Sequence, residues 1–286
     1  MQYYKIRDFG EKLSVTVDFF RENLKSLIVI GLVIGIPGGI ASSIALSNYF
    51  GAFTTMMGET EEDSIAAVTN MMSSMGLWSI FSLIVYALLT GLIYTYMKKI
   101  DGGNEKPSIG DLFREVVPRV PGLVVLLVIL FIIAMLGFTF FFIPGLYLMI
   151  VFSLAIPVYF FENASIGEAM SKPFKLIKGK WWSTFGLLFI SGIIAGLASY
   201  VFAIPMYVSM FSGLFEAVES AETDPNVFLE SYTSWQTVAG TAFFTMGSYI
   251  LYSIPIIALA FQYFNLKERT EATGIRSEID NFEALS

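Results

Sequence analysis

Six long apolar segments, separated by polar stretches, dominate this sequence. A helix needs about 20 consecutive apolar residues to cross the hydrocarbon layer of a bilayer. Segments of roughly this length occupy about 24–46, 73–97, 121–142, 145–161, 181–207 and 236–265. Because the chain is also 55% hydrophobic and only 14% charged, its composition is typical of a membrane protein. The sequence predicts an all-α fold, a polytopic bundle of six transmembrane helices. It would form a single membrane domain over 1–266, with a polar cytoplasmic tail at 267–286.

The basic residues predict how the segments are oriented. All 17 Lys and Arg residues lie before or at the very start of the first segment, between the second and third, between the fourth and fifth, or after the sixth. The other three connections, at 47–72, 141–145 and 208–235, contain none. Connections that stay in the cytoplasm are enriched in Lys and Arg. This distribution therefore predicts that both termini are cytoplasmic.

Two of the lysine-free connections are acidic instead. Their acidic residues are Glu59, Glu61, Glu62, Asp63, Glu216, Glu219, Glu222, Asp224 and Glu230. Such residues are typical of a solvated face that stays out of the membrane. An attraction for divalent cations or basic proteins is the alternative. Since no basic domain is present, nucleic acid is not expected as a partner.

Missing residue types exclude several kinds of chemistry. The chain has no cysteine and no histidine, which excludes disulfides, thiolate or imidazole metal sites, and Ser/His or Cys/His catalysis. The apolar segments contain no charged residue at depth, which argues against proton relays and ion pathways. No metal, no cofactor and no catalytic residue is expected.

Three amphipathic stretches precede apolar segments. The first, at 5–22, has apolar residues three and four apart and predicts an interfacial helix with Arg7 and Lys12 on its polar side. The starts of the three stretches carry capping pairs, which are Asp8 with Glu11, Ser108 with Asp111, and Ser165 with Glu168. We interpret the chain as three units, each an interfacial helix followed by a two-span hairpin. In the second unit, Ile143, Pro144 and Gly145 are expected to form the tight outer turn.

Small residues and prolines inside the spans are the other candidate sites. Gly31, Gly35 and Gly39 recur every four residues, as do Gly192 and Gly196, and such spacing lets helices approach closely. The contact would lie within the monomer or with a second copy or partner. Prolines at 37, 157, 205 and 255 are expected to kink their spans, with Pro157 in the fourth. Nearby hydroxyls would satisfy the freed carbonyls or line a polar cavity for an amphiphile.

The stretch from 143 to 181 resembles a group of bacterial membrane domains. These are the membrane domain of some glycerophosphodiester phosphodiesterases and the free-standing YciC-like proteins. The residues that carry the resemblance are Ile143, Pro144, Gly145, Ala155, Pro157, Glu162, Glu168, Ala169, Lys178, Gly179 and Trp181. The chain departs from the group at Ser171, Lys172 and Pro173, where an Arg/Ser pair is common. The resemblance implies a multi-span helical fold without catalysis, and no catalytic residue carries over from it.

These patterns lead to one preferred function and two alternatives. The preferred hypothesis is a non-enzymatic, multi-pass protein of the bacterial inner (cytoplasmic) membrane, acting as a scaffold or accessory subunit of a membrane protein assembly. Its partners would be membrane lipids and other membrane proteins, which it would contact through small-residue faces or the cytoplasmic helices. The first alternative is a lipid or amphiphile carrier with a cavity among the proline-kinked spans four to six. An intramembrane enzyme is the second, with Glu162 and Glu168 as its only acid/base candidates.

Overall fold

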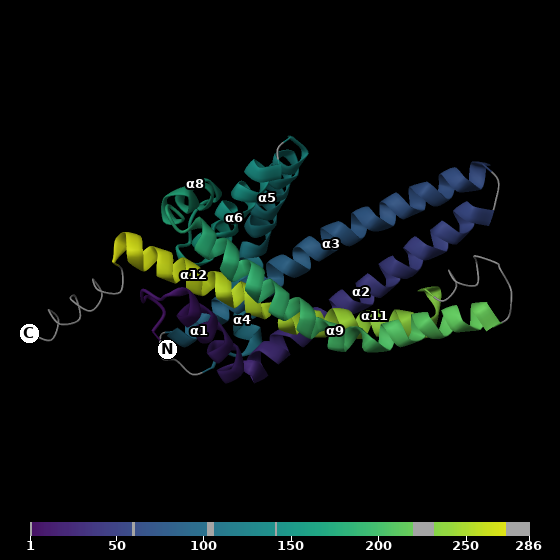
Figure 1. Ribbon diagram of the computed structural model, residues 1–286, viewed down its shortest axis with the longest axis horizontal. Helices are drawn as coiled ribbons and strands as arrows, with labels where there is room; N and C mark the ends of the chain where they lie inside the picture. Colours follow the sequence, from purple (N-terminus) through teal and green to yellow (C-terminus); the bar gives the residue numbers. More distant parts are fainter. Residues whose placement is uncertain (1, 59–60, 102–105, 141, 220–231, 273–286) are drawn as a thin grey trace, which may run out of the picture. The chain divides into compact units, whose positions relative to one another are not determined.

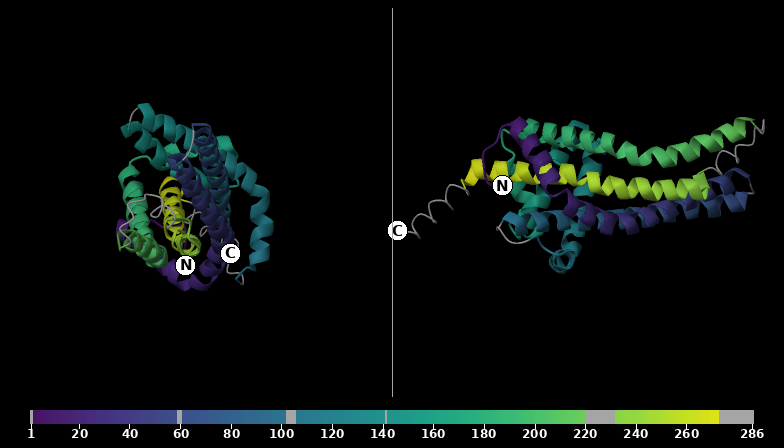
Figure 2. Two further views of the ribbon diagram at one scale, coloured as in Figure 1. Left: turned by 90° about the vertical axis from the view of Figure 1, so that its right-hand side faces the viewer. Right: turned by 90° about the horizontal axis from the view of Figure 1, so that it is seen from below.

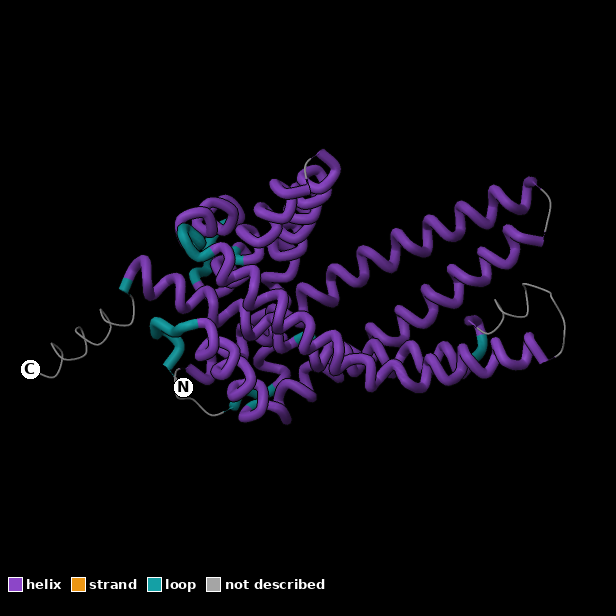
Figure 3. Tube along the Cα trace, in the orientation of Figure 1, coloured by secondary structure: helices purple, strands orange, loops and turns teal. Residues whose placement is uncertain are grey.

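The fold is helical throughout the part of the chain that the structure describes. The computed structural model describes residues 2–58, 61–101, 106–140, 142–219 and 232–272, and every regular element in these ranges is a helix (Figures 1 and 3). Six of its segments are long and apolar enough to cross a membrane. They are Leu24–Phe53, Ser64–Asp101, Ile109–Phe140, Phe142–Phe161, Trp181–Gly213 and Trp235–Glu271. The predicted all-α class with six membrane-spanning helices is confirmed.

The chain forms two compact units, each assembled from separate stretches of sequence. Unit 1 contains Met1–Leu27, Ala87–Ile194 and Tyr252–Ser286. Unit 2 contains Ile28–Tyr86 and Ala195–Leu251. The acidic residues Glu59, Glu222, Asp224 and Glu230, and the part of the predicted tail from 273 to 286, lie outside the described residues.

Three short helices of unit 1 start where the capping pairs predicted. Helix α1 (Phe9–Glu22) begins after Asp8, α4 (Ile109–Val116) after Ser108, and α8 (Ile166–Leu176) after Ser165. In each case the cap side chain accepts a hydrogen bond from the backbone N–H three residues later, which satisfies one of the free amides at a helix start. Residues 5–7, which the predicted first helix included, therefore precede it.

The last described helix, α12 (Ser253–Glu271), forms the core of unit 1. It packs against α1, α7 (Ala155–Phe161) and α8 (Figure 1). Its residues from 256 to 266 are all buried, so this helix has no exposed face over that length. A helix that is buried all round belongs to the interior of a protein rather than to its surface. Its polar residues must consequently find partners within unit 1.

Two spans are each divided into two helices, and both breaks lie three residues before a proline. Helix α6 (Phe142–Ser153) and α7 are separated by Leu154, and α11 (Trp235–Leu251) and α12 by Tyr252. In both cases a proline, Pro157 or Pro255, follows three residues after the break. Proline has no N–H to donate to the carbonyl four residues earlier, which here belongs to the last residue of the preceding helix. Pro37 and Pro205, in contrast, lie inside continuous helices.

Unit 2 takes residues from three long helices and from α11. These are α2 (Leu24–Gly58), α3 (Glu61–Asp101) and α9 (Trp181–Glu219), of 35, 41 and 39 residues. At about 1.5 Å per residue each is roughly 50–60 Å long, almost twice the thickness of the hydrocarbon layer. The helices therefore continue into the stretches at 47–72 and 208–235, which the sequence assigned to connections. Within unit 2, α11 lies side by side with α9 and with α2 (Figure 2).

Candidate functional site

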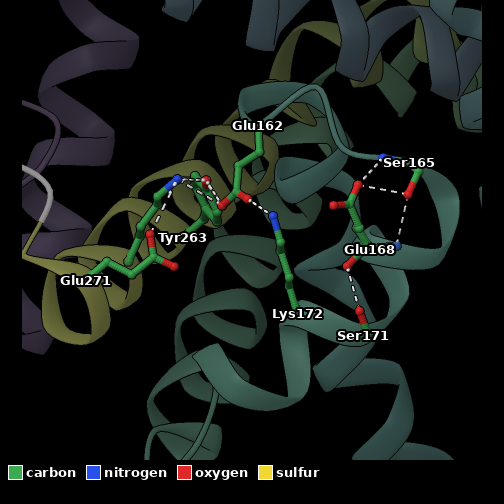
Figure 4. Close-up of polar contacts among 8 residues, drawn as sticks. Glu162, Ser165, Glu168, Ser171, Lys172, Tyr263 and Glu271 are labelled. Carbon is green, nitrogen blue, oxygen red and sulfur yellow. Dashed lines mark hydrogen bonds and ion pairs between the residues drawn. The ribbon is translucent and has the colours of Figure 1, made fainter.

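Two polar clusters in unit 1, the first partly buried and the second buried, are the candidate functional sites. The first, the Glu162 cluster, joins three elements (Figure 4). Glu162 is the C-cap of α7, Lys172 lies on α8, and Tyr263 and Lys267 lie on α12. The Glu162 carboxylate accepts hydrogen bonds from Lys172 Nζ at 2.5 Å, Tyr263 Oη at 2.7 Å and Lys267 Nζ at 2.9 Å. This carboxylate therefore ties the third capped helix to the core helix.

The two lysines decide the charge state of Glu162. The side chain is only 12% exposed, and burial alone would raise the pKa of its carboxyl group. Hydrogen bonds from Lys172, Tyr263 and Lys267 outweigh burial and hold the pKa below its ordinary value. The same contact raises the pKa of Lys172. Glu162 is consequently ionised at neutral pH and occupied by cations, which is the opposite of a carboxyl group prepared for general acid catalysis.

Glu168 is engaged at the start of α8. Its carboxylate accepts hydrogen bonds from the backbone N–H and the hydroxyl of Ser165, at 2.9 and 2.8 Å, while Ser165 Oγ accepts from the Glu168 N–H. These hydrogen bonds lower the pKa of Glu168. This reciprocal arrangement is the capping box that the sequence predicted. The two acids named as possible acid/base groups therefore both have structural partners.

The second cluster, the Lys12 cluster, lies between α1, α9 and α12. Lys12 is 3% exposed, and its Nζ donates to Ser183 Oγ at 2.6 Å and to Gln262 Oε1 at 2.8 Å. The Gln262 amide nitrogen donates to Thr184 Oγ1 at 2.7 Å. Among the described residues, no carboxylate lies within ion-pair distance of Lys12. A buried ammonium is thus solvated by neutral oxygens alone.

Burial makes Lys12 the most perturbed lysine of the described chain. Loss of solvent, followed by the positive charges of Arg269 and Lys180, lowers its pKa from 10.5 to about 8, and Asp8 opposes this only in part. The ammonium group of Lys12 therefore loses its proton at a much lower pH than an ordinary lysine does. The cluster therefore joins helices and remains sensitive to pH.

The placement of Lys12 corrects the sequence analysis, which put it on the polar side of an interfacial helix. The buried residues of α1 are Lys12, Thr16 and Phe19, and Arg7 just before the helix is also buried. The correction has a physical reason, because Gln262 and Ser183 provide acceptors for Lys12 and backbone carbonyls do so for Arg7. The spacing of Lys12, Thr16 and Phe19, four and three residues apart, places them on one face of the helix and could have indicated this burial.

The two predicted glycine faces have different surroundings. Within unit 2, a Cβ added to Gly31, Gly35 or Gly39 would meet Ile250, Met246 or Ala242 of α11 at 3.0 Å or less. These glycines therefore allow α2 and α11 to approach closely within the monomer. A Cβ added at Gly192 or Gly196 of α9 would meet nothing within 4 Å. Only the first face is used in packing within the described residues.

Pro144 and Gly145 do not form the turn that was expected from them. Both lie in the first turn of α6, where a proline is tolerated because its missing N–H has no helical partner. Residue 141, which separates α6 from α5 (Val120–Phe140), lies outside the described residues. A Cβ added to Gly145 would lie 2.7 Å from the carbonyl carbon of Gly137, so these two glycines allow a close approach of α5 and α6. The sequence analysis missed Gly137.

Hydroxyl groups near the prolines are satisfied by their own helices. Ser199, Thr245 and Ser248 each donate to the backbone carbonyl four residues earlier, at 2.7, 2.8 and 2.7 Å. This local pattern lets a hydroxyl lie in an apolar helix without an exposed polar atom. The acceptors are the carbonyls of Ala195, Thr241 and Phe244, not the carbonyls four residues before Pro205 and Pro255, so these three hydroxyls do not make the expected pairing.

Comparisons with known proteins give no relative to which the site can be compared. No family model, curated protein or solved structure matches the chain. The decisive observation is therefore the set of six apolar helices of spanning length. The chain is a multi-pass membrane protein. Within the described part of this membrane protein, no group of three or more acidic side chains is placed to hold a metal ion.

Proposed function

We propose that this multi-pass membrane protein is a non-enzymatic scaffold or accessory subunit of a membrane protein assembly. The Glu162 cluster is the observation that carries the proposal. A catalytic acid or base must be free to exchange a proton with substrate, whereas Glu162 is held by two lysines and a tyrosine. Glu168, the other candidate, is held in its capping box. The charged groups thus support a structural role, without a cofactor or nucleic acid.

The distribution of Lys and Arg supports an orientation with both termini in the cytoplasm, here of the bacterial inner membrane. In that orientation α1, α4 and α8 face the cytoplasmic side, where lipid head groups and other membrane proteins are the available partners. The open face of α9 at Gly192 and Gly196 would admit a partner helix. The resemblance of residues 143–181 to bacterial membrane domains points to the same non-catalytic role and stays a prediction.

Purification from native membranes tests the subunit role. The protein, tagged and extracted in mild detergent, is expected to retain at least one membrane protein partner in constant ratio. The double variant G192L/G196L fills the open face of α9 and should release that partner, while the matched variant G51L, at another open glycine, should keep it. Recovery of the tagged protein alone under every mild extraction condition would refute the subunit role.

A lipid or amphiphile carrier is the second candidate. The observation that favours it is the pair of helix breaks at Leu154 and Tyr252, since such breaks are points where a span can bend. A carrier must move a bound lipid between membranes or leaflets. Reconstituted vesicles should therefore show protein-dependent transfer of a fluorescent phospholipid. Transfer no faster than in protein-free vesicles would exclude this candidate.

A further inference from the structure

Four aromatic rings of unit 1 form a stacked row, which we call the aromatic ladder. Tyr147 on α6 is followed by Trp181, Phe185 and Phe189 on α9. Successive ring planes differ by 15°, 2° and 16°, with centroids 6.1, 5.5 and 5.6 Å apart. Trp181 is fixed by a hydrogen bond from its indole nitrogen to the Tyr147 carbonyl at 3.2 Å. The ladder is therefore an ordered apolar surface.

The aromatic ladder is exposed at its two ends and partly buried at Trp181 and Phe185. Tyr147 and Phe189 are exposed, and Trp182, which packs edge-on against Trp181 and Phe185, is 77% exposed. Trp181 begins a segment that is long and apolar enough to span the membrane. The three rings on α9 thus start at the end of one span and continue into its apolar part, while Tyr147 belongs to the preceding span, Phe142–Phe161. Aromatic rings at that depth are suited to acyl chains below a head group.

Uncompensated positive charge adjoins the same end of the ladder. Lys178 and Lys180 immediately precede Trp181, and both are exposed. Neither has an ion pair among the described residues. The nearby acids Glu162 and Glu168 are already bound, the first by Lys172 and Lys267 and the second by its cap. An anion approaching Lys178 and Lys180 would consequently meet no competing carboxylate from the α7–α8 segment.

The buried Lys12 reports the same positive potential independently. Its ammonium group lies 2.6 Å from Ser183 Oγ, in the first turn of α9, and no carboxylate neutralises it among the residues described. The positive charge of Lys180 is one of the causes that lower the pKa of Lys12. This end of α9 therefore has exposed and buried cations that form no ion pair among the described residues, with Asp8 acting on Lys12 only at longer range.

We propose that Lys178 and Lys180, together with the aromatic ladder, bind one anionic phospholipid. Its phosphate lies between the two lysines and an acyl chain lies along Trp181, Phe185 and Phe189. An anionic lipid fits because it alone among bilayer components combines a net negative head group with an apolar chain of this length. Juxtamembrane lysines strengthen binding to anionic lipid substantially. The site goes beyond the scaffold role and does not depend on it.

Tryptophan fluorescence gives a local test on the full-length protein. Of the four Trp residues, Trp78 and Trp235 lie elsewhere, so W78F and W235F leave Trp181 and Trp182 as reporters. Phosphatidylglycerol and phosphatidylcholine carrying bromine on their acyl chains are titrated separately into mixed micelles. Brominated phosphatidylglycerol is expected to reach half-maximal quenching at a roughly tenfold lower mole fraction than the zwitterionic lipid.

Two double variants distinguish a site from general attraction to positive charge. K178Q/K180Q should abolish the preference for phosphatidylglycerol. K25Q/K98Q removes the same charge from two other exposed lysines of unit 1 and should keep the preference. Equal quenching by both lipids in the parent, or equal loss in both variants, overturns the proposal. Native mass spectrometry of the protein without any tryptophan change should likewise show retained phosphatidylglycerol that K178Q/K180Q loses, and its retention in that variant would also overturn the proposal.

Discussion

Lys12 of α1 donates a hydrogen bond of 2.8 Å to Gln262 of α12, a residue 250 positions later in the sequence. Tyr3 makes a comparable long-range contact, donating to the Met97 carbonyl at 3.1 Å. The amino-terminal segment is thus fixed to the interior of unit 1 by polar groups as well as by apolar packing. Polar contacts in such surroundings are specific, because a buried donor without an acceptor is costly.

The free energy of unfolding should increase with pH because of Lys12. Its pKa is about 8 in the folded protein and close to 10.5 when the chain is unfolded. Between these values the unfolded state binds more protons, so folding becomes more favourable as pH rises through the window. It becomes less favourable as pH falls through the folded-state pKa. At about 1.4 kcal/mol per pH unit, the gain across the window is about 3 kcal/mol.

Denaturant unfolding in detergent micelles from pH 7 to 10.5 measures this gain. The K12M variant keeps the length of the side chain but has no charge to titrate, so the increase should largely disappear. K175M changes an exposed lysine instead and should preserve it. A K12M profile with the same slope as the parent would show that Lys12 is not the group responsible.

Removing the charge of Glu162 should destabilise unit 1. E162Q leaves Lys172 and Lys267 without their shared carboxylate, and the loss is costly although solvent at Lys172, which is 42% exposed, reduces it below the cost for a fully buried pair. We expect a decrease of about 2–3 kcal/mol in the free energy of unfolding at pH 7. Because the pKa of Glu162 is lowered in the folded protein, its contribution is present above the ordinary Glu pKa and is lost as pH falls through the folded-state value.

The matched control for E162Q is E168Q, since glutamine can still accept the hydrogen bond that closes the capping box. Its effect should be much smaller than that of E162Q. Stability is measured at pH 7 and again at pH 4, where the difference between E162Q and the parent should shrink. If E168Q is as destabilising as E162Q, the contacts of Glu162 with the two lysines do not explain the loss of stability.

Glycines 39 and 196 should respond oppositely to substitution by alanine. At Gly39 a Cβ would lie 2.7 Å from the carbonyl oxygen of Ala242, a backbone atom that cannot move independently. G39A should therefore cost about 1–3 kcal/mol through forced separation of α2 and α11. At Gly196 nothing lies within 4 Å, and alanine should stabilise α9 by up to about 1 kcal/mol. Thermal unfolding of both variants in one detergent decides between this pattern and equal effects.

Single cysteines should reveal the orientation of the protein. The chain contains no cysteine, so N70C and K178C each introduce one unique thiol at an exposed position. Asn70 lies near the start of α3, in the stretch 47–72 that contains no Lys or Arg, and Lys178 lies in a lysine-rich connection. A membrane-impermeant maleimide should label N70C in intact cells with the outer membrane opened, and K178C only after the inner membrane is permeabilised. Labelling of K178C from outside would reverse the proposed orientation.

Local features of the sequence predicted the helices and their starts well. The capping pairs at Asp8, Ser108 and Ser165 act over three residues, and the structure shows each of them at a helix start. Hydropathy likewise identified the six spans, since membrane crossing depends on composition within about 20 residues. These predictions needed no knowledge of which helices pack together.

Tertiary contacts decided what the sequence left open. Lys12 and Arg7 looked like solvated charges, and only acceptors far along the chain allow them to be buried. Pro144 followed by Gly145 is a strong turn signal, but the same pair is compatible with a first helical turn when Gly137 leaves room for it. The break at Tyr252 could not be predicted, because the sequence does not show that Pro255 divides its span whereas Pro37 lies in a continuous helix.

The helix at the core of unit 1, α12, is synthesised after the helices that pack against it. Ribosomes make α1, α7 and α8 before α12, although α12 is the surface on which all three pack. Until α12 has left the ribosome, unit 1 lacks its core helix, and the earlier helices have no main packing partner. A chain truncated before Ser253 should therefore be degraded rapidly in a pulse-chase experiment. We therefore expect the quality control of this protein to depend on the synthesis of α12.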